Sequence, residues 1–398
     1  MKRIMLMILL NLIFAISLYS QSMPYVLLIS FDGFRWDYSL RSITPNLEKM
    51  KQDGVSALSL RPAFPSLTFP NHYSEITGMY TENHGIIGNN IYDPFTGEKF
   101  SMSTKESKWF LGEAFWETAR RSGIKTASYF WPGSEMDLDY RRPDYYKPYD
   151  HSKDYLERID TVIYWLQLPP AERPHFITLY FDDTDTYGHR YGPNSPEVNE
   201  SIARLDSLTG ELYARLERIG MIDSVNVIIT SDHGMTEVSK DRVINVAEIV
   251  SDYDCKLWGH GTMMSVQCAA EDRENIYRTL YENRKHFRVY LKENMPSFYH
   301  YSKHPFIPDF LIFADMGWSL EKGDSLGMTA KGVHGYEKDH TDMHGTFIAS
   351  GPVFKSGYPT GTLWNIDIYP LLCDIYNIEP RSNVDGKLER IEFILKGK

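Results

Sequence analysis

The sequence predicts an α/β fold with a central, mostly parallel sheet and helices on both faces. Short β-rich runs alternate with helical periods along most of the 398 residues, beginning with the apolar run YVLLISF at 25–31. Strands separated by helices favour parallel pairing, because a helical crossover returns the chain in the same direction. Such an open sheet binds ligands beyond the carboxyl ends of its strands.

The individual elements follow from hydrophobic periodicity, with a period near 3.6 for helices and buried apolar runs for strands. In chain order, we expect a strand at 25–31, a helix at 111–122, a strand at 125–130, a helix at 154–166, a strand at 175–181, a helix at 197–219, a strand at 224–230, a strand at 346–349 and a final helix at 367–376.

The alternation breaks between about 255 and 330. This stretch carries short β runs at 263–268 and 310–313 and a helix near 274–284. We expect an inserted small α/β excursion that packs over or beside the main sheet. Because no linker or repeat interrupts the rest, we expect a single domain over 24–398.

The composition excludes several classes of protein. Apolar residues make up 42% of the chain and charged residues 24%, which excludes a disordered or fibrous protein. Lys and Arg number 42 against 53 Asp and Glu, a formal net charge of −11. A basic face for duplex nucleic acid is therefore not expected. If the ligand is an anion, something other than net charge must attract it, and a metal ion would do so.

The first 20 residues predict a secretory signal peptide. Lys2 and Arg3 precede an apolar run from Ile4 to Leu18, and small residues follow. The run is short for a bilayer span, which needs about 20 residues; an uncleaved anchor is the alternative. No other stretch is apolar enough to span a membrane. We therefore expect a secreted or periplasmic protein without a transmembrane span in the mature chain.

Three cysteines, Cys255, Cys268 and Cys373, are too few and too irregularly spaced for a disulfide framework. A single bridge between Cys255 and Cys268 is possible, and the sequence leaves it open.

Acidic residues follow three of the predicted apolar strands. Asp32, Asp185 and Asp232 come after the strands at 25–31, 175–181 and 224–230, respectively. A single Asp after a strand is usually a turn former or a helix cap, but three at one edge of a sheet can converge. Two of them have a histidine close by, because His189 follows Asp185 and His233 follows Asp232. This composition is typical of a metal site.

A third imidazole comes from the segment GVHGYEKDH, which contains His334. His340 and His344 compete for the same role, and the residue types alone do not decide between them.

Thr68 lies in the segment FPSLTFPNHYSEITG. Pro70 suits the first turn of a helix, so Thr68 is expected at or just before a helix N-terminus, where backbone N–H groups favour an anion. The alternative is a simple N-cap hydroxyl. Asn89, in HGIIGNN, is a neutral hydrogen-bond donor that could belong to the same site or to a turn.

The segments FPSLTFPNHYSEITG, HGIIGNNIYDP, FWPGS, DTDTYGHRYGP, TSDHGM and GVHGY occur in this order. Together they resemble the nucleotide pyrophosphatase/phosphodiesterase family of the alkaline phosphatase superfamily. The resemblance extends from about residue 24 to about residue 374. It implies an alkaline phosphatase-like fold and a hydrolase that acts on phosphodiesters.

The resemblance also implies the residues of the site. Two zinc ions are expected, one held by Asp185, His189 and His334, and the other by Asp32, Asp232, His233 and the oxygen of Thr68. Thr68 is the expected nucleophile, and Asn89 is expected to contact a phosphoryl oxygen. A nucleobase slot is expected between Phe69 and Tyr149, with Trp131 and Tyr180 nearby.

One departure from the family is visible. The chain reads DDTDTYGH where many animal members have a proline before the ligand aspartate, but the ligand spacing is unchanged. The HGY context of His334 matches the family, whereas that of His344 does not. The three imidazoles also favour zinc over magnesium, which prefers oxygen ligands.

The expected activity is hydrolysis of nucleotide phosphodiester or pyrophosphate bonds to nucleoside 5′-monophosphates through a phosphothreonine intermediate. A choline- or glycerol-phosphodiester hydrolase is the alternative on the same fold, because aromatic faces also bind ammonium groups. A monoesterase is disfavoured, although Arg35 and Arg61 are candidate phosphate clamps. A sulfatase is disfavoured because no Cys precedes a Pro-Ser-Arg run. A non-catalytic zinc-binding module is disfavoured because the expected nucleophile is present together with all the expected metal ligands. The oligomeric state is not predicted.

Overall fold

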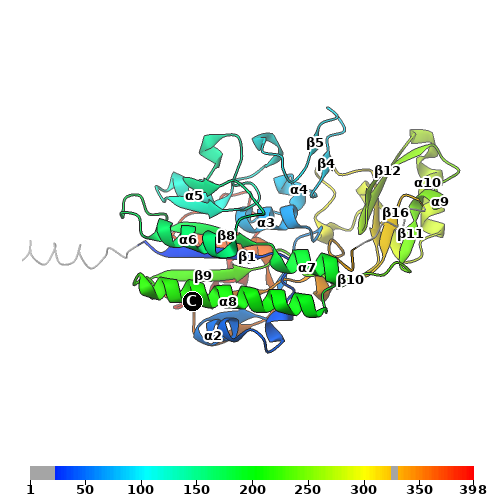
Figure 1. Cartoon of the computed structure of the whole chain (residues 1–398). Helices are drawn as coiled ribbons and strands as arrows, with labels where there is room; N and C mark the ends of the chain where they lie inside the picture. The colour runs from blue at the N-terminus through cyan, green and yellow to red at the C-terminus, as the bar shows by residue number, and fades with distance from the viewer. Residues whose placement is uncertain (1–22, 324–329) are drawn as a thin grey trace, which may run out of the picture.

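The computed structural model describes residues 23–323 and 330–398, so the signal peptide predicted at 1–20 lies outside them. An eight-stranded sheet forms the centre of the molecule, in the order β19-β2-β18-β9-β1-β8-β6-β7 (Figure 1). Five strands run parallel: β1 (Tyr25–Phe31), β6 (Thr126–Tyr129), β7 (Tyr145–Lys147), β8 (Phe176–Phe181) and β9 (Val225–Thr230). The predicted α/β class with a mostly parallel sheet is confirmed.

One edge of the sheet departs from the parallel arrangement. Strand β18 (Phe347–Ser350) is antiparallel to β9, β2 (Val55–Ala57) is antiparallel to β18, and β19 (Tyr358–Thr360) is parallel to β2. The strands that precede the three predicted ligand acids, β1, β8 and β9, lie side by side in the parallel part.

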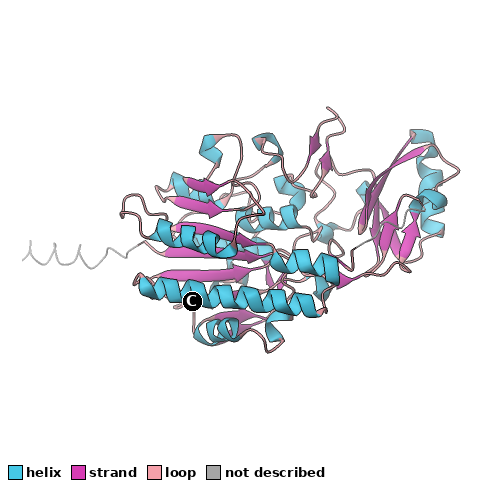
Figure 2. Ribbon diagram, in the orientation of Figure 1, coloured by secondary structure: helices cyan, strands magenta, loops and turns pink. Residues whose placement is uncertain are grey.

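Both faces of the sheet are buried, as a near-continuous apolar strand such as YVLLISF requires. Val26 and Leu28 of β1 pack into a core with α3 (Thr68–Thr77), α5 (Phe115–Arg121) and α11 (Ile368–Ile375). Leu27 and Ile29 point the other way, toward α2 (Pro45–Asp53), α6 (Tyr155–Leu166) and α8 (Pro196–Arg218). The sheet is therefore sandwiched between two layers of helices (Figure 2).

The predicted elements agree with the observed ones closely, with one informative exception. Helix α5 begins at Phe115 rather than near residue 111. Gly112 has a φ of 78°, a left-handed conformation that a helix cannot contain. The side chain of Glu117 then accepts a hydrogen bond from the Ala114 backbone N–H at 3.1 Å, which fixes the later start.

A smaller lobe lies at one end of the sheet (Figure 1). Its four-stranded antiparallel sheet has the order β12-β13-β15-β14, with β12 (Cys255–His260), β13 (Met263–Cys268), β14 (Phe287–Leu291) and β15 (Phe310–Ala314), and α10 (Arg273–Glu282) packs on it. Cys255 and Cys268 are directly opposite each other across β12 and β13, as separate thiols.

The chain returns from the small lobe to the main sheet through β17 (Gly332–Val333), which pairs antiparallel with β10 (Thr236–Glu237). Strand β10 begins three residues after His233, so this pairing carries His334 back to the strand ends. Across the residues that the structure describes, no helix combines the length and the apolar character that a membrane span needs.

Candidate active site

The register of the central strands brings the predicted acids to one edge of the sheet. Phe31 pairs with Phe181, and Ser30 pairs with Thr230. Asp32 therefore leaves the sheet at nearly the same level as Asp232, two residues beyond Thr230. Asp185 lies in the first turn of α7 (Asp183–Tyr191), which follows β8 directly.

A first group of metal-ligand atoms is formed by Asp185, His189 and His334, whose ligand atoms all lie within 4.8 Å of one another. The Nε2 atoms of His189 and His334 lie 3.4 Å and 3.6 Å from the same carboxylate oxygen, Oδ1 of Asp185. His189 follows Asp185 by four residues on α7, a spacing that places both side chains on one face of the helix.

A second group surrounds His233. Its Nε2 atom lies 3.0 Å from Oδ2 of Asp232 and 3.4 Å from Oδ1 of Asp32. The hydroxyl oxygen of Thr68 lies 3.3 Å from the same nitrogen. The two groups adjoin each other, because the rings of His233 and His334 stack with their centroids 3.5 Å apart.

Backbone carbonyls orient all three imidazoles. The Nδ1 atoms of His189, His233 and His334 lie 2.8 Å, 2.9 Å and 2.9 Å from the carbonyl oxygens of Gly332, Gly234 and Ser66. A ring that donates its Nδ1–H to a carbonyl keeps a lone pair on Nε2, the arrangement found in metal-ligating histidines. Burial and the neighbouring imidazoles of His233 and His189 also hold the pKa of His334 well below its usual value.

The carboxylates of the site are suited to binding a cation. Oδ1 of Asp32, Oδ1 of Asp185 and Oδ2 of Asp232 are buried and have no hydrogen-bond partner within the described part of the chain. Burial, and then the charges of Asp232 and Asp185, raise the pKa of Asp32 well above its usual range. Burial acts in the same direction on Asp232, but the imidazoles of His233 and His72 outweigh it and lower its pKa. Clustered buried carboxylates of this kind are stable when a metal ion compensates their charge.

Thr68 is the first residue of α3, as the sequence predicts for the start of a helix. Buried Asn71 fixes the loop before it: its side chain donates to the carbonyls of Pro65 and Leu67, both at 2.9 Å, and accepts from the Ala63 N–H at 2.8 Å. The Thr68 hydroxyl is thereby held beside the second ligand group.

Asn89 also contacts the start of α3. Its side-chain oxygen accepts the Phe69 backbone N–H at 3.0 Å. The amide nitrogen of Asn89 is not used by this bond, and it has no hydrogen-bond partner in residues 23–323 or 330–398. The backbone N–H of Thr68 is likewise without a partner in these ranges. Two donors are thus available next to the Thr68 hydroxyl.

His72 belongs to the same cluster and was not predicted. It lies one turn after Thr68 on α3 and is fully buried. Its Nδ1 lies 2.9 Å from the Thr68 carbonyl and 3.4 Å from Oδ2 of Asp232, while its Nε2 lies 2.7 Å from the Ser30 hydroxyl. The four-residue spacing from Thr68 on a predicted helix was the available signal for it.

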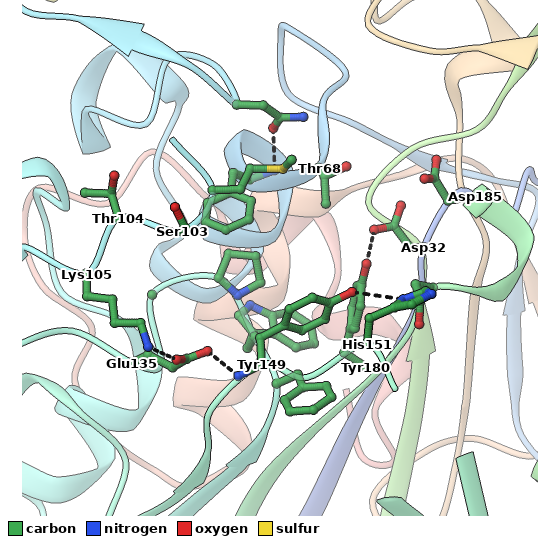
Figure 3. Close-up of a pocket in the computed structure, with 18 of the residues that line it drawn as sticks. Asp32, Thr68, Ser103, Thr104, Lys105, Glu135, Tyr149, His151, Tyr180 and Asp185 are labelled. Atoms are coloured by element: carbon green, nitrogen blue, oxygen red, sulfur yellow. Dashed lines mark hydrogen bonds and ion pairs between the residues drawn. The ribbon is translucent and has the colours of Figure 1, made fainter. Parts of the chain in front are cut away.

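The ligand groups form one end of a cavity of about 690 Å³. Figure 3 shows Thr68, Asp32 and Asp185 on one side of this pocket, and Lys105 and Glu135 on the other. The lining includes the four aromatic residues predicted for substrate binding, Phe69, Trp131, Tyr149 and Tyr180, and also Asn89.

The four aromatics differ in how they are held. Tyr180 is buried and donates its hydroxyl to Oδ2 of Asp32 at 2.6 Å, and the buried Trp131 donates its indole N–H to the His72 carbonyl at 3.0 Å. Tyr149, by contrast, is 51% exposed. Phe69 is half-buried and packs on Phe100.

The competing histidine and arginine candidates lie elsewhere. Both ring nitrogens of His344 are engaged, by the Ser59 hydroxyl and the Lys338 carbonyl. His340 pairs with Glu337. Arg35 binds Asp37 and the Met235 carbonyl, and Arg61 pairs with Asp339. None of these four side chains lines the cavity.

Comparison with known proteins agrees with this geometry. Residues 26–337 match the family described as type I phosphodiesterase / nucleotide pyrophosphatase. The chain is 36% identical over 387 residues to ectonucleotide pyrophosphatase/phosphodiesterase family member 3 of Bos taurus, covering 94% of this chain and 44% of that protein. It therefore spans less than half the length of this relative. It is 35% identical over 378 residues to a bis(5′-adenosyl)-triphosphatase of Xenopus laevis, covering 94% of this chain and 82% of that protein.

Solved structures show the same fold. Murine ectonucleotide pyrophosphatase/phosphodiesterase 5, in an inactive form in complex with AMP, superposes with a TM-score of 0.89 at 30% identity, covering 94% of this chain and all of that one. The human protein of the same name superposes with a TM-score of 0.88 at 32% identity, covering 94% of this chain and 100% of the human chain. Since the family match and these relatives span most of its length, this chain belongs to the type I phosphodiesterase/nucleotide pyrophosphatase family.

Proposed function

We propose that this protein is a secreted, zinc-dependent phosphodiesterase that hydrolyses nucleotide phosphodiester and pyrophosphate bonds to nucleoside 5′-monophosphates. The observation that carries the proposal is the position of the Thr68 hydroxyl, 3.3 Å from Nε2 of His233 and at the edge of a cluster of three carboxylates and four imidazoles. The family membership supports the class of reaction.

Two zinc ions would be held by side chains from the two adjoining clusters. Asp185, His189 and His334 would hold one, and Asp32, Asp232, His233 and the Thr68 oxygen the other. The mixture of imidazoles and carboxylates suits zinc. When bound, the ions would offset the negative charge of the phosphate and lower the pKa of a coordinated hydroxyl group or water molecule.

The chain's own residues would carry out two displacements. The Thr68 oxygen attacks phosphorus, a bond from Thr68 to phosphorus forms, and the bond to the leaving oxygen breaks. The proton of the Thr68 hydroxyl passes through solvent to the leaving oxygen. The free amide nitrogen of Asn89 and the backbone N–H of Thr68 donate to the phosphoryl oxygen as negative charge shifts onto it. Water then cleaves the phosphothreonine and restores the Thr68 hydroxyl. Two in-line steps give net retention of configuration at a chiral phosphorus.

The charges of the pocket support a diester substrate over a monoester. A dianionic phosphate monoester is typically clamped by arginine. Among the described residues that line the cavity, Lys105 is the one Lys or Arg side chain, and it is paired with Glu135 at 2.7 Å. A singly charged diester needs no such clamp.

The aromatic end of the pocket supports a nucleobase over a choline headgroup. Phe69 and Tyr149 line it, and the chain is similar to a murine protein solved with AMP. Aromatic faces also attract a quaternary ammonium group, and a free carboxylate beside them would favour such a group further. The two acids at this end, Glu135 and Asp182, are instead paired with Lys105 and His151, both at 2.7 Å.

Turnover of p-nitrophenyl-TMP and p-nitrophenylphosphorylcholine by the purified chain, before and after chelation, tests the proposal. We expect preferential hydrolysis of the TMP ester, loss of this activity with 1,10-phenanthroline, and recovery on adding Zn²⁺. A clear preference for the choline ester would overturn the nucleotide assignment, and full activity after exhaustive chelation would overturn the zinc assignment.

A further inference from the structure

Tyr149 occupies an exposed loop between β7 and α6, and little packing holds its ring. All residues from 147 to 154 are exposed, including Tyr149 itself at 51%. The ring makes edge contacts with Phe130 and Tyr180, at centroid distances of 5.0 Å and 6.3 Å. An aromatic side chain in such a loop would have to be ordered when a ligand binds, unless polar contacts fix it beforehand.

The first such contact holds the backbone of the loop. The Tyr149 N–H donates to Oε1 of Glu135 at 2.6 Å, and Oε2 of Glu135 lies 2.7 Å from the ammonium group of Lys105. Figure 3 shows this chain of contacts along the wall of the pocket. It fixes the position at which the Tyr149 side chain leaves the backbone, but not the direction of the ring.

The second contact lies two residues further along. Nδ1 of His151 is 2.7 Å from Oδ2 of Asp182, and the Tyr149 phenol oxygen lies 3.5 Å from the same nitrogen. Asp182 follows the last residue of β8, and its side chain is 7% exposed. Its other oxygen is contacted by the Tyr155 hydroxyl at 3.3 Å and by the buried guanidinium of Arg158 at 3.4 Å. The exposed loop is thereby tied to the end of β8.

We propose that His151 is a positioning residue, which with Asp182 fixes Tyr149 as a wall of the base-binding slot and so sets the preference for substrates that carry a nucleobase. This inference rests on the function proposed above. His151 makes none of the metal-group contacts described for His189, His233 and His334. His151 also lines the pocket, where it is placed by the loop that carries Tyr149 and not by the sheet edge.

The test compares two substrates that share a leaving group. p-Nitrophenyl-TMP places a nucleoside in the slot, whereas methyl p-nitrophenyl phosphate places only a methyl group there. In His151→Ala we expect the KM for the TMP ester to rise by about 2- to 10-fold, the range that ordering one or two side chains costs, without an equal fall in kcat. The KM for the methyl ester should stay near its wild-type value.

Two further variants complete the design. His151→Asn keeps a donor that can reach Asp182, and it should restore most of the preference. His340→Ala removes an exposed imidazole that pairs with Glu337 outside the pocket, and it should leave both substrates unaffected. Because the His151 side chain is 67% exposed, we expect the His151 variants to fold like the wild type, and thermal unfolding will check this.

An unchanged KM for the TMP ester in His151→Ala would overturn the inference, and so would an equal rise for both substrates or a failure of His151→Asn to restore the preference. The wild-type enzyme separates this failure from that of the proposed function. If wild type shows no preference for the TMP ester over the methyl ester, the nucleotide assignment itself is wrong.

Discussion

The two ends of the pocket are built in different ways. At the metal-ligand end, the side chains leave the carboxyl ends of β1, β8 and β9, and Asp32, Asp232 and His233 are almost fully buried. At the aromatic end, Lys105, Tyr149 and His151 come from loops, and their side chains are half exposed or more. One end depends on the register of a sheet, the other on a few contacts between loops.

Under the proposed function, the reaction chemistry belongs to the sheet edge and the substrate preference to the loops. A displacement on phosphorus requires the nucleophile, the charge and the donors to be held within fractions of an ångström. Strand ends locked by parallel pairing provide that rigidity. Loops can change in sequence without disturbing the sheet, so they suit the part of the site that selects among substrates.

The largest effect is expected from removing the proposed nucleophile. Thr68→Ala should lower kcat for nucleotide esters by at least about 10³-fold, because the covalent step has no other oxygen at that position. Zinc content should remain, since six other side chains supply the ligands. Steady-state kinetics and metal analysis would measure both.

The matched control is Thr104→Ala, which removes a hydroxyl from the opposite side of the same pocket and should retain most of the activity. Near-normal turnover by Thr68→Ala would exclude its role as the nucleophile.

A smaller effect at the same end is expected from Tyr180→Phe. The Tyr180 hydroxyl donates to Oδ2 of Asp32 at 2.6 Å and leaves Oδ1 directed at the cluster. Losing a contact of this kind to a metal ligand typically weakens metal binding by about 10- to 100-fold. Inactivation should therefore need correspondingly less chelator, as a titration followed by dialysis and metal analysis would show.

Tyr145→Phe removes a hydroxyl that donates a hydrogen bond to the Glu172 carbonyl away from the cavity. Inactivation of this variant should need as much chelator as inactivation of the wild type. If Tyr180→Phe behaves like this control, Tyr180 does not orient a metal ligand.

The smallest effect belongs to the aromatic end. Tyr149→Ala should lower kcat/KM for a nucleotide ester by about 10-fold, as loss of one stacking face of about 1–3 kcal/mol predicts. Tyr149→Phe should stay near wild type, because the ring face is kept. If Tyr149→Ala lowered kcat/KM equally for nucleoside and methyl esters, the aromatic end of the pocket would not act on substrate preference independently of the metal-ligand end.

The sheet edge could be predicted because its signals are local and repeated. An apolar run of seven residues that ends at Asp32 predicts both a buried strand and the position of the acid, and β1 spans the predicted residues. Parallel register then determines which strand ends meet. The strand predicted at 346–349 matches β18, but its antiparallel direction was not predicted, and β2 was not predicted at all. Strand direction depends on connections between segments far apart in the sequence, which no local pattern shows.

The partners of individual side chains were much less predictable. The hydrogen bond from Tyr180 to Asp32 joins residues 148 positions apart, and the contact of Trp131 with the His72 carbonyl joins residues 59 apart. Such pairs depend on how helices and loops pack on the sheet. His72 was overlooked for the same reason: it lies in a recognised motif, but its role depends on Asp232 and Ser30.

We propose that side chains from three neighbouring strand ends and from the returning segment at His334 hold a pair of zinc ions beside Thr68. Anomalous diffraction at the zinc edge, on crystals of the purified chain, tests it most directly. We expect two peaks, one among Asp185, His189 and His334, and one among Asp32, Asp232 and His233 near the Thr68 oxygen. Crystals grown with zinc present that show no peak at either position, or zinc bound elsewhere, would exclude a zinc pair at this site.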